Sequence, residues 1–182
     1  MTAPKLKTRG GSDLYDRDFH AWTQDQAARL RTLSGQQRID AAHLAEEIED
    51  LGNRDIRELN SRLREALTHL LKLAAYPAQE PPRHWFEEVD RQHTDALEVV
   101  AQSPGLRQHV DVQDIWVKAL RRANRALAKY DEPPLPTDPH CPFSRDELLD
   151  NDFDPDAALI RVKGALADTR ARGKVTRGVS RP

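Results

Sequence analysis

Apolar residues recur every three or four positions along most of the chain, a spacing that predicts α-helices. The first such stretch follows Ser12 or Asp13, either of which can cap a helix, and it ends at Ser34-Gly35. We therefore expect a first helix between these two points. Its apolar face consists of Tyr15, Phe19, Trp22, Leu30 and Leu33.

The second stretch predicts a much longer helix over Ala41–Ala75, with Asp40 as its cap. Its leucine and isoleucine residues recur at helical spacing, and no proline occurs before Pro77. At about 1.5 Å per residue, this helix is expected to be roughly 50 Å long. Gly52-Asn53 lies within it, and a glycine there costs only about 1 kcal/mol, so the sequence allows either a bend or a true break.

Two more helices are expected in the middle of the chain. Pro81 or Pro82 suits the first turn of the third helix, since proline fits the start of a helix. That helix stops at Ser103-Pro104-Gly105, and a short turn over Leu106–Val110 follows. The fourth helix is expected over Val112–Tyr130. Two small residues in its apolar stripe would let a neighbouring helix approach closely: Ala119 and Ala123.

The C-terminal part of the chain is expected to be less regular. Pro133–Pro142 is a proline-rich strap that cannot form regular helix. Ser144 and Glu147 form a capping box, which predicts one or two helical turns. A weakly amphipathic helix is expected over Ala157–Ala167, and disorder beyond Arg172.

These elements predict an all-α fold, because no alternating run is long enough for a strand. Four long helices with apolar stripes need each other's faces, so we expect an antiparallel four-helix-type bundle with a proline-rich C-terminal strap and a flexible basic tail. The expected organisation is a disordered N-terminal arm over residues 1–11, a helical bundle domain over 12–155, and a short helix with a disordered basic tail over 156–182.

Charge changes this picture at the two ends. The formal net charge is −2, but residues 1–11 carry three basic groups and no acid, and residues 161–182 carry seven basic groups and one acid. Basic tails on an acidic body can contact nucleic acid or anionic lipid, or can simply be solvated. No aromatic residue interleaves these basic groups, as stacking on bases would require.

Composition also bears on the compartment. No apolar run approaches the roughly 18 residues that a membrane span needs, and no apolar stretch follows the basic N-terminus as in a secretory signal. Cys141 is the single cysteine, so no internal disulfide can form. We therefore expect a cytoplasmic protein that has no membrane partner.

Five short segments follow one another in a characteristic order: Asp18-Phe19-x-x-Trp22-Thr23, Glu46-Glu47-Ile48-Glu49-Asp50-Leu51-Gly52, His69-Leu70-Leu71-Lys72, Ser103-Pro104-x-Leu106, and Cys141-Pro142-Phe143 followed by Glu147-Leu148-Leu149. In this order and spacing they resemble the bacterial domain-of-unknown-function family twenty-nine. The resemblance extends from about Asp13 to Pro155 and implies an all-α fold and a prokaryotic origin. It implies no activity.

The third helix departs from that family's pattern. The family has Ser-Trp, Thr-Ile and Gln-Arg where this chain has His84-Trp85, Glu88-Val89 and Gln92-His93. Any chemistry that the family performs with that serine, threonine or arginine is therefore lost or altered here.

His93 is the most unusual of the candidate residues, because it lies in the middle of the apolar face of the third helix. A polar group there must find a partner or lose several kcal/mol. We expect a carboxylate partner, and the interpretation is either a buried polar pair that fixes helix register or an acid–base site between helices. The contenders for the partner are Asp18, Glu47, Glu49 and Asp55.

His69 shares a face of the long helix with Glu47, but the two are about 33 Å apart along an unbroken helix. They can share a site only if the helix breaks or another chain contributes. Otherwise His69 is a boundary histidine bonded to a neighbouring helix. The acidic cluster beside Glu47 is either a metal-binding face or a solvated one, and the Glu-x-x-His motifs that a two-metal bundle site needs are absent. The candidate catalytic residues are His93, His69, Glu47, Glu49 and Asp18.

A stripe of five basic residues occupies the face of the fourth helix opposite its apolar stripe. It can bind phosphates, face acidic residues of the same or another chain, or be solvated. The candidates for polyanion binding are Lys118, Arg121, Arg122, Arg125 and Lys129.

No complete catalytic motif is present, and we predict no cofactor. His140-Cys141 has no second cysteine at metal-ligand spacing, so we expect Cys141-Pro142 to anchor the strap. The leading hypothesis is a non-enzymatic helical interaction module of the bacterial cytoplasm, whose partner is another protein or a second copy of itself. The alternatives are a metal-dependent or acid–base hydrolase with an interhelical His/carboxylate cluster, and a nucleic-acid-associated protein that uses the basic helix and tail.

Overall fold

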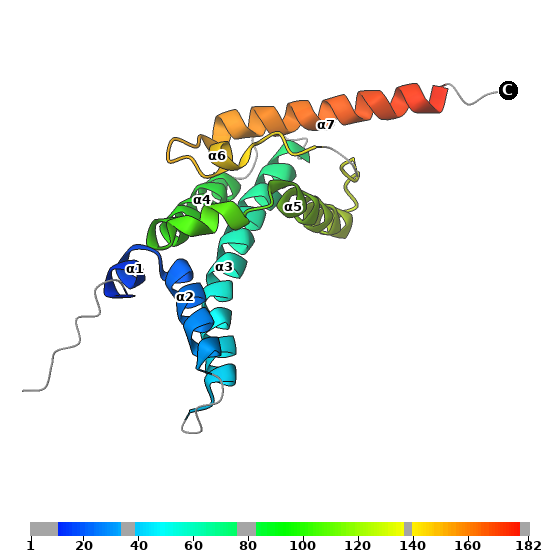
Figure 1. Ribbon diagram of the computed structural model, residues 1–182. Helices are drawn as coiled ribbons and strands as arrows, with labels where there is room; N and C mark the ends of the chain where they lie inside the picture. Colours follow the sequence, from blue (N-terminus) through cyan, green and yellow to red (C-terminus); the bar gives the residue numbers. More distant parts are fainter. Residues whose placement is uncertain (1–10, 34–38, 76–82, 137–139, 179–182) are drawn as a thin grey trace, which may run out of the picture. The chain divides into compact units, whose positions relative to one another are not determined.

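A computed structural model describes residues 11–33, 39–75, 83–136 and 140–178 of the chain. Every regular element in these ranges is helical, which confirms the all-α prediction (Figure 1). The elements are α1 (Gly11–Arg17), α2 (Phe19–Thr32), α3 (Ala41–Ala75), α4 (Arg83–Gln102), η1 (Pro104–His109), α5 (Val112–Leu127), η2 (Ala128–Tyr130), α6 (Arg145–Leu148) and α7 (Pro155–Gly178).

The chain divides into two compact units, a division that the sequence did not predict. Unit 1 contains Met1–Leu59 and Glu98–His109, and unit 2 contains Asn60–Leu97 and Val110–Pro182. Each unit is described below by itself. The single bundle domain over residues 12–155 and its antiparallel arrangement stay predictions.

The expected first helix is in fact two helices, because the chain breaks at Asp18. Asp18 has extended backbone angles (φ −157°, ψ 90°), and its Oδ1 accepts a hydrogen bond from the amide of Ala21 across 2.9 Å. An aspartate that bonds to the backbone in this way stops one helix and starts the next, and this local competition overrides the apolar spacing.

The predicted apolar face of this segment is also not the buried one. The side chains that α2 buries are His20, Thr23 and Ala27, whereas Tyr15 is 49 % exposed. Tyr15, Phe19 and Trp22 instead contact one another, with ring centroids 4.9 to 5.7 Å apart.

The long helix is confirmed, since α3 has the predicted bounds and does not break at Gly52. Asp40 caps it by accepting from the amide of His43 across 3.3 Å. In unit 1, α2 lies alongside the N-terminal half of α3 (Figure 1). A Cβ added at Gly52 would lie 2.1 Å from Thr23 Oγ1, so the glycine is there to let α2 approach.

The core of unit 2 consists of aliphatic residues from α3, α4 and α5 around the fully buried Trp116. Ala119 and Ala123 are completely buried, consistent with the expected close approach of a neighbouring element. The fourth predicted helix is confirmed as α5, and its last turn is the 3-10 turn η2. The predicted start of the third helix at Pro81 or Pro82 lies outside the described residues.

The strap follows α5, and no regular element occurs between η2 and α6 in the described residues. Asn124 anchors it with two hydrogen bonds to Leu135: the amide of Leu135 donates to Oδ1 across 2.7 Å, and Nδ2 donates to the carbonyl across 3.3 Å. The capping box of Ser144 and Glu147 is confirmed at the start of α6. Helix α7 is longer than the predicted Ala157–Ala167, because it continues through the segment beyond Arg172 that was expected to be disordered and ends at Gly178.

No helix in the described parts of the chain combines the length and the apolarity that crossing a membrane requires.

Candidate functional site

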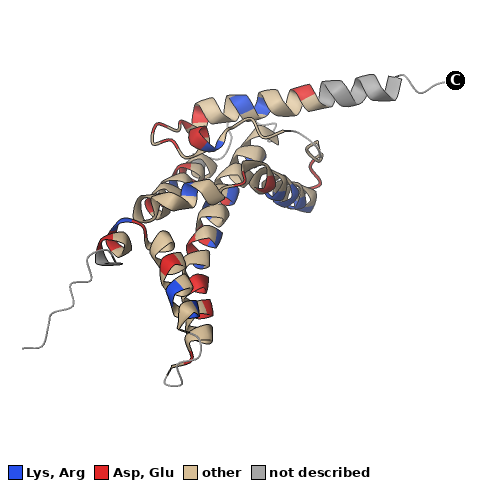
Figure 2. Cartoon of the chain, in the orientation of Figure 1, with Lys and Arg blue, Asp and Glu red and all other residues tan. Residues whose placement is uncertain are grey.

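The basic stripe of α5 borders two adjoining pockets in unit 2. In Figure 2 the blue parts of this helix mark its Lys and Arg residues. The first pocket has a volume of about 660 Å³ and is lined by Arg64, Lys118, Arg121, Arg122, Asn124 and Arg125. The second has a volume of about 480 Å³ and is lined by Glu65, Thr68, His69, Lys72, Arg122, Arg125, Ala126 and Lys129. Arg122 and Arg125 line both pockets. We call the first the Arg64 pocket and the second the His69 pocket, and the two together the basic groove.

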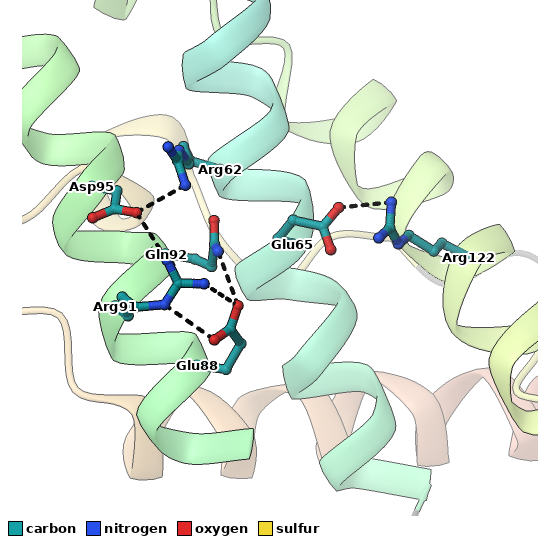
Figure 3. A network of polar contacts seen from close by, with 7 residues as sticks. All are labelled: Arg62, Glu65, Glu88, Arg91, Gln92, Asp95 and Arg122. Carbon is teal, nitrogen blue, oxygen red and sulfur yellow. Dashed lines mark hydrogen bonds and ion pairs between the residues drawn. The ribbon is translucent and has the colours of Figure 1, made fainter. Parts of the chain in front are cut away.

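The basic groove contains more positive charge than the carboxylates around it neutralise. Arg122 pairs with Glu65 across 2.8 Å (Figure 3), and Lys118 pairs with Asp114 across 2.6 Å. Within the described ranges no carboxylate pairs with the remaining basic side chains of the groove, which are Arg64, Lys72, Arg121, Arg125 and Lys129. The groove is therefore strongly positive although the whole chain carries −2.

Two of these cations were not among the sequence candidates. Arg64 and Lys72 lie on α3, and they join the stripe only because α3 packs beside α5 in unit 2. The Lys72 ammonium lies over the ring of Trp85, 4.3 Å from its centroid. Burial lowers the pKa of Lys72, and the positive charge of Arg122 lowers it further.

His69 lines the groove beside Lys72, which corrects the expectation that it bonds to a neighbouring helix. Its Nδ1 is buried and has no hydrogen-bond partner in the described part of the chain. Burial, followed by the charge of Lys72, lowers the pKa of His69 to about 4. The imidazole is therefore neutral at physiological pH.

A network of polar side chains connects α3 and α4 in unit 2 (Figure 3). Glu88 accepts from Arg91 Nη2 across 2.5 Å and from Gln92 Nε2 across 2.9 Å. Asp95 accepts from Arg62 across 2.9 Å and so links the two helices. The hydrogen bond from Arg91, then that from Gln92, lowers the pKa of Glu88. The network therefore keeps a negative charge on α4 beside His69.

His93 is buried, as expected, but the predicted carboxylate partner is wrong. Its Nε2 lies 3.0 Å from the carbonyl oxygen of Leu148, and its ring stacks on Phe153 with centroids 4.3 Å apart. A carbonyl oxygen only accepts, so Nε2 carries the proton. Burial lowers the pKa of His93. The residue therefore joins α4 to the segment after the strap.

The contenders for that partner have other roles within unit 1. Asp18 Oδ2 accepts from the amide of Gly105 across 2.7 Å, in addition to capping α2. Glu49 pairs with Arg31, and Glu47 is exposed. Burial raises the pKa of Asp55, and the nearby His20 partly offsets this. The five candidate catalytic residues do not form one cluster within either unit.

A third pocket lies wholly within unit 1, and the sequence did not indicate it. It has a volume of about 460 Å³, and its lining includes His20, His109 and the side-chain amides of Gln24, Asn53 and Gln108. The two imidazole rings meet edge to face, 4.9 Å apart. The glycine in the middle of α3 was the one available signal, since it marks the place where α2 approaches.

Cys141 lies at the end of the strap, near Arg161. Burial raises the pKa of its thiol to about 11, and its backbone amide donates to Gln113 across 3.0 Å. This contact fits the expected role of Cys141-Pro142 in anchoring the strap. Across the described ranges, no three His, Cys, Asp or Glu side chains gather closely enough to hold a metal ion.

Comparison with known proteins places this fold beside one other solved structure. A family model described as a domain of unknown function, DUF29, matches residues 14–154. The crystal structure of an α-helical protein of unknown function from Rhodospirillum rubrum is 34 % identical, with a TM-score of 0.70 over 81 % of this chain and 96 % of that chain. No curated protein matches the chain.

Proposed function

The chain belongs to the DUF29 family, and for this member we propose a non-enzymatic helical binding module whose basic groove holds the phosphate backbone of nucleic acid. The proposal rests on the seven basic side chains from α3, α5 and η2 that surround two adjoining pockets.

The spacing of the cations on α5 suits an extended polyanion. From Lys118 to Lys129 the basic residues follow at helical spacing, which covers about 16 Å of helix axis. A nucleic-acid duplex carries one negative charge per about 1.7 Å of its axis. A duplex of this length carries about nine phosphates on its two strands together, and those on the side towards the groove can contact its cations.

The residue types favour backbone contact over base recognition. Four of the seven cations are arginines, whose planar guanidinium can donate two parallel hydrogen bonds to one phosphate. No aromatic residue is among the described residues that line the groove. Binding is therefore expected to depend little on base sequence, because contacts to phosphate carry no sequence information. The lack of stacking platforms argues against a preference for single strands.

The predicted protein partner or self-association remains an alternative. Unit 1 exposes several large apolar side chains that can contact another protein: Tyr15, Leu33, Ile39, Leu44 and Leu51. An acidic protein surface can also occupy the basic groove, because its carboxylates satisfy the same cations. The experiment below separates that occupant from nucleic acid.

The test is fluorescence anisotropy of a labelled DNA duplex titrated with the full chain at several salt concentrations. We expect the affinity to fall steeply with salt. The double variant Arg121→Gln/Arg125→Gln should reduce the slope of log K against log salt by about 1.8, since each lost phosphate contact contributes about 0.9.

Arg57→Gln is the matched control, because Arg57 is an exposed cation on α3 in unit 1 that does not line the groove. It should leave the slope unchanged. The proposal fails if the duplex does not bind at low salt, or if the groove variant and the control behave alike. Competition by poly-glutamate at equal charge concentration would instead assign the groove to an acidic protein.

A further inference from the structure

We propose that the His69 pocket is a subsite for a terminal phosphate, a phosphomonoester dianion such as the 5′ end of a nucleic-acid strand or a free phosphate. The inference rests on the proposed function. In that function the groove binds the internal phosphodiesters of a nucleic-acid backbone, and here the His69 pocket binds a terminal phosphate.

The charges around this pocket fit a dianion. Four cations line it, Lys72, Arg122, Arg125 and Lys129, whereas the carboxylates are Glu65 in the lining and Glu88 on α4 nearby. An internal phosphodiester carries one negative charge, whereas a terminal phosphate carries about −1.5 to −2 at neutral pH and offers three acceptor oxygens. The His69 pocket can therefore satisfy the extra charge and the extra acceptors.

His69 supplies a feature that the Arg64 pocket lacks. Its Nδ1 is buried without a partner in the described residues, so no protein group there fixes which ring nitrogen carries the proton. Because Nδ1 is turned into the protein, the ring lines the pocket with its other atoms. The tautomer with the proton on Nε2 can donate to a phosphate oxygen.

The electrostatics of the empty pocket point the same way. Burial, followed by the charge of Lys72, lowers the pKa of His69 and keeps its ring neutral. His69 therefore offers the ligand a hydrogen-bond donor without a charge. Burial is the main cause of the lowered pKa of Lys72, and the repulsion between Lys72 and Arg122 lowers it further. A bound dianion relieves that repulsion.

Two of the pocket's cations are already held in place. The ring of Trp85 holds the ammonium of Lys72, and Glu65 holds the guanidinium of Arg122 at 2.8 Å. Little side-chain freedom is lost when a phosphate binds between them, which favours a compact ligand.

The first experiment uses inorganic phosphate alone. Long-range ¹H–¹⁵N spectra of the full chain report the ring nitrogens of each histidine during a phosphate titration. We expect a saturable shift of the His69 nitrogens, while those of His93 stay constant because its Nε2 is bonded to Leu148. Shifts of His69 no larger than those of His93 would overturn the subsite.

The second experiment compares duplexes with a 5′-phosphate and with a 5′-hydroxyl. We expect roughly tenfold tighter binding of the phosphorylated end, the size of one good charge-assisted hydrogen bond. His69→Phe keeps the ring volume but removes both nitrogens, so it should reduce the preference, which the cations alone then maintain, while leaving the salt slope intact. His69→Gln, which retains a donor, should restore part of the preference.

The outcomes separate the two proposals. A phosphate-dependent shift of His69 without any duplex binding overturns the proposed function and supports the subsite for a free phosphate. Duplex binding with no preference for the phosphorylated end, and no shift of His69 with phosphate, overturns the subsite and leaves the proposed function standing. Circular dichroism of each variant confirms that it is folded.

Discussion

Nδ1 of His20 on α2 lies 3.1 Å from the backbone carbonyl oxygen of Gly52 on α3. The two helices of unit 1 are therefore in contact at a residue that has no side chain. The carbonyl oxygen only accepts, and Nδ1 of His20 therefore donates. The backbone amide of His20 also donates to Ser103 Oγ across 3.2 Å. A side chain at position 52 would occupy the space that this arrangement needs.

Gly52→Ala is accordingly expected to destabilise the protein, although alanine favours a helix by about 1 kcal/mol over glycine. The new Cβ would lie 2.1 Å from Thr23 Oγ1, and Thr23 is completely buried. Overpacking of this kind costs about 1–3 kcal/mol, so we expect a net loss in the free energy of unfolding, measured by urea denaturation.

Gly164→Ala is the matched control for this substitution, since a Cβ at Gly164 in α7 meets nothing within 4 Å. It should leave the stability unchanged or raise it by up to about 1 kcal/mol. Equal effects of the two substitutions would show that α2 does not pack on α3 as described.

Asp18→Ala should lower the free energy of unfolding by about 2 kcal/mol, because it removes the cap of α2 and the acceptor for the Gly105 amide together. Chemical denaturation measures the change. Asp16→Ala removes an exposed aspartate of α1 and is expected to change the stability by less than about 0.5 kcal/mol. A neutral effect of Asp18→Ala would contradict the double role of its carboxylate.

Stability should decrease as the pH falls from about 6.5 towards about 4, in part because of His69. Its pKa is about 4 in the folded chain, against an ordinary value of 6.5. In this window the unfolded chain takes up a proton that the folded chain does not, so lowering the pH favours unfolding. The stability that His69 contributes is complete above its unfolded pKa.

Urea denaturation at pH 7, 6 and 5 checks this prediction. The loss of stability should be smaller in His69→Phe than in the unmodified chain. His43→Gln serves as the comparison, because the hydrogen bond to Asp40 raises the pKa of His43, and its removal should not reduce the loss. An equal pH dependence with and without His69 would show that its ring is accessible to water.

Asn124→Ala should release the strap from α5. Both hydrogen bonds to Leu135 disappear, and the buried backbone groups of Leu135 lose their partner, a cost of about 1–3 kcal/mol. Hydrogen exchange of the Leu135 amide should become faster, whereas amides in the middle of α3 keep their protection. Unchanged exchange at Leu135 would mean that the strap is held by other contacts.

The sequence predicted a residue's contacts where its partners are a few positions away, and failed where they are distant along the chain. The capping box of Ser144 and Glu147 was readable because its partners are three positions apart. The break at Asp18 was missed because an aspartate can cap a helix or lie on its surface, and the apolar spacing continues across it. The second contact of Asp18, with Gly105, lies far along the chain.

The candidate site was only partly predictable for the same reason. The spacing on α5 singled out five cations without the structure, but Arg64, Lys72 and the orientation of His69 depend on how α3 packs beside α5. His93 was correctly expected to be buried, and its partner proved to be a backbone carbonyl, an acceptor that side-chain identities do not reveal.

By itself, the amino-acid sequence determined the all-helical class, the two ends of α3 and the five-cation stripe of α5, because propensity, capping and helical periodicity act over a few neighbouring residues. It left open whether α3 breaks at Gly52. Tertiary packing alone decided that His20, Thr23 and Ala27 form the buried face of α2, that Gly52 serves a close contact, and that cations of two helices surround one groove. Those outcomes depend on which distant surfaces meet, and no local pattern along the chain encodes that choice.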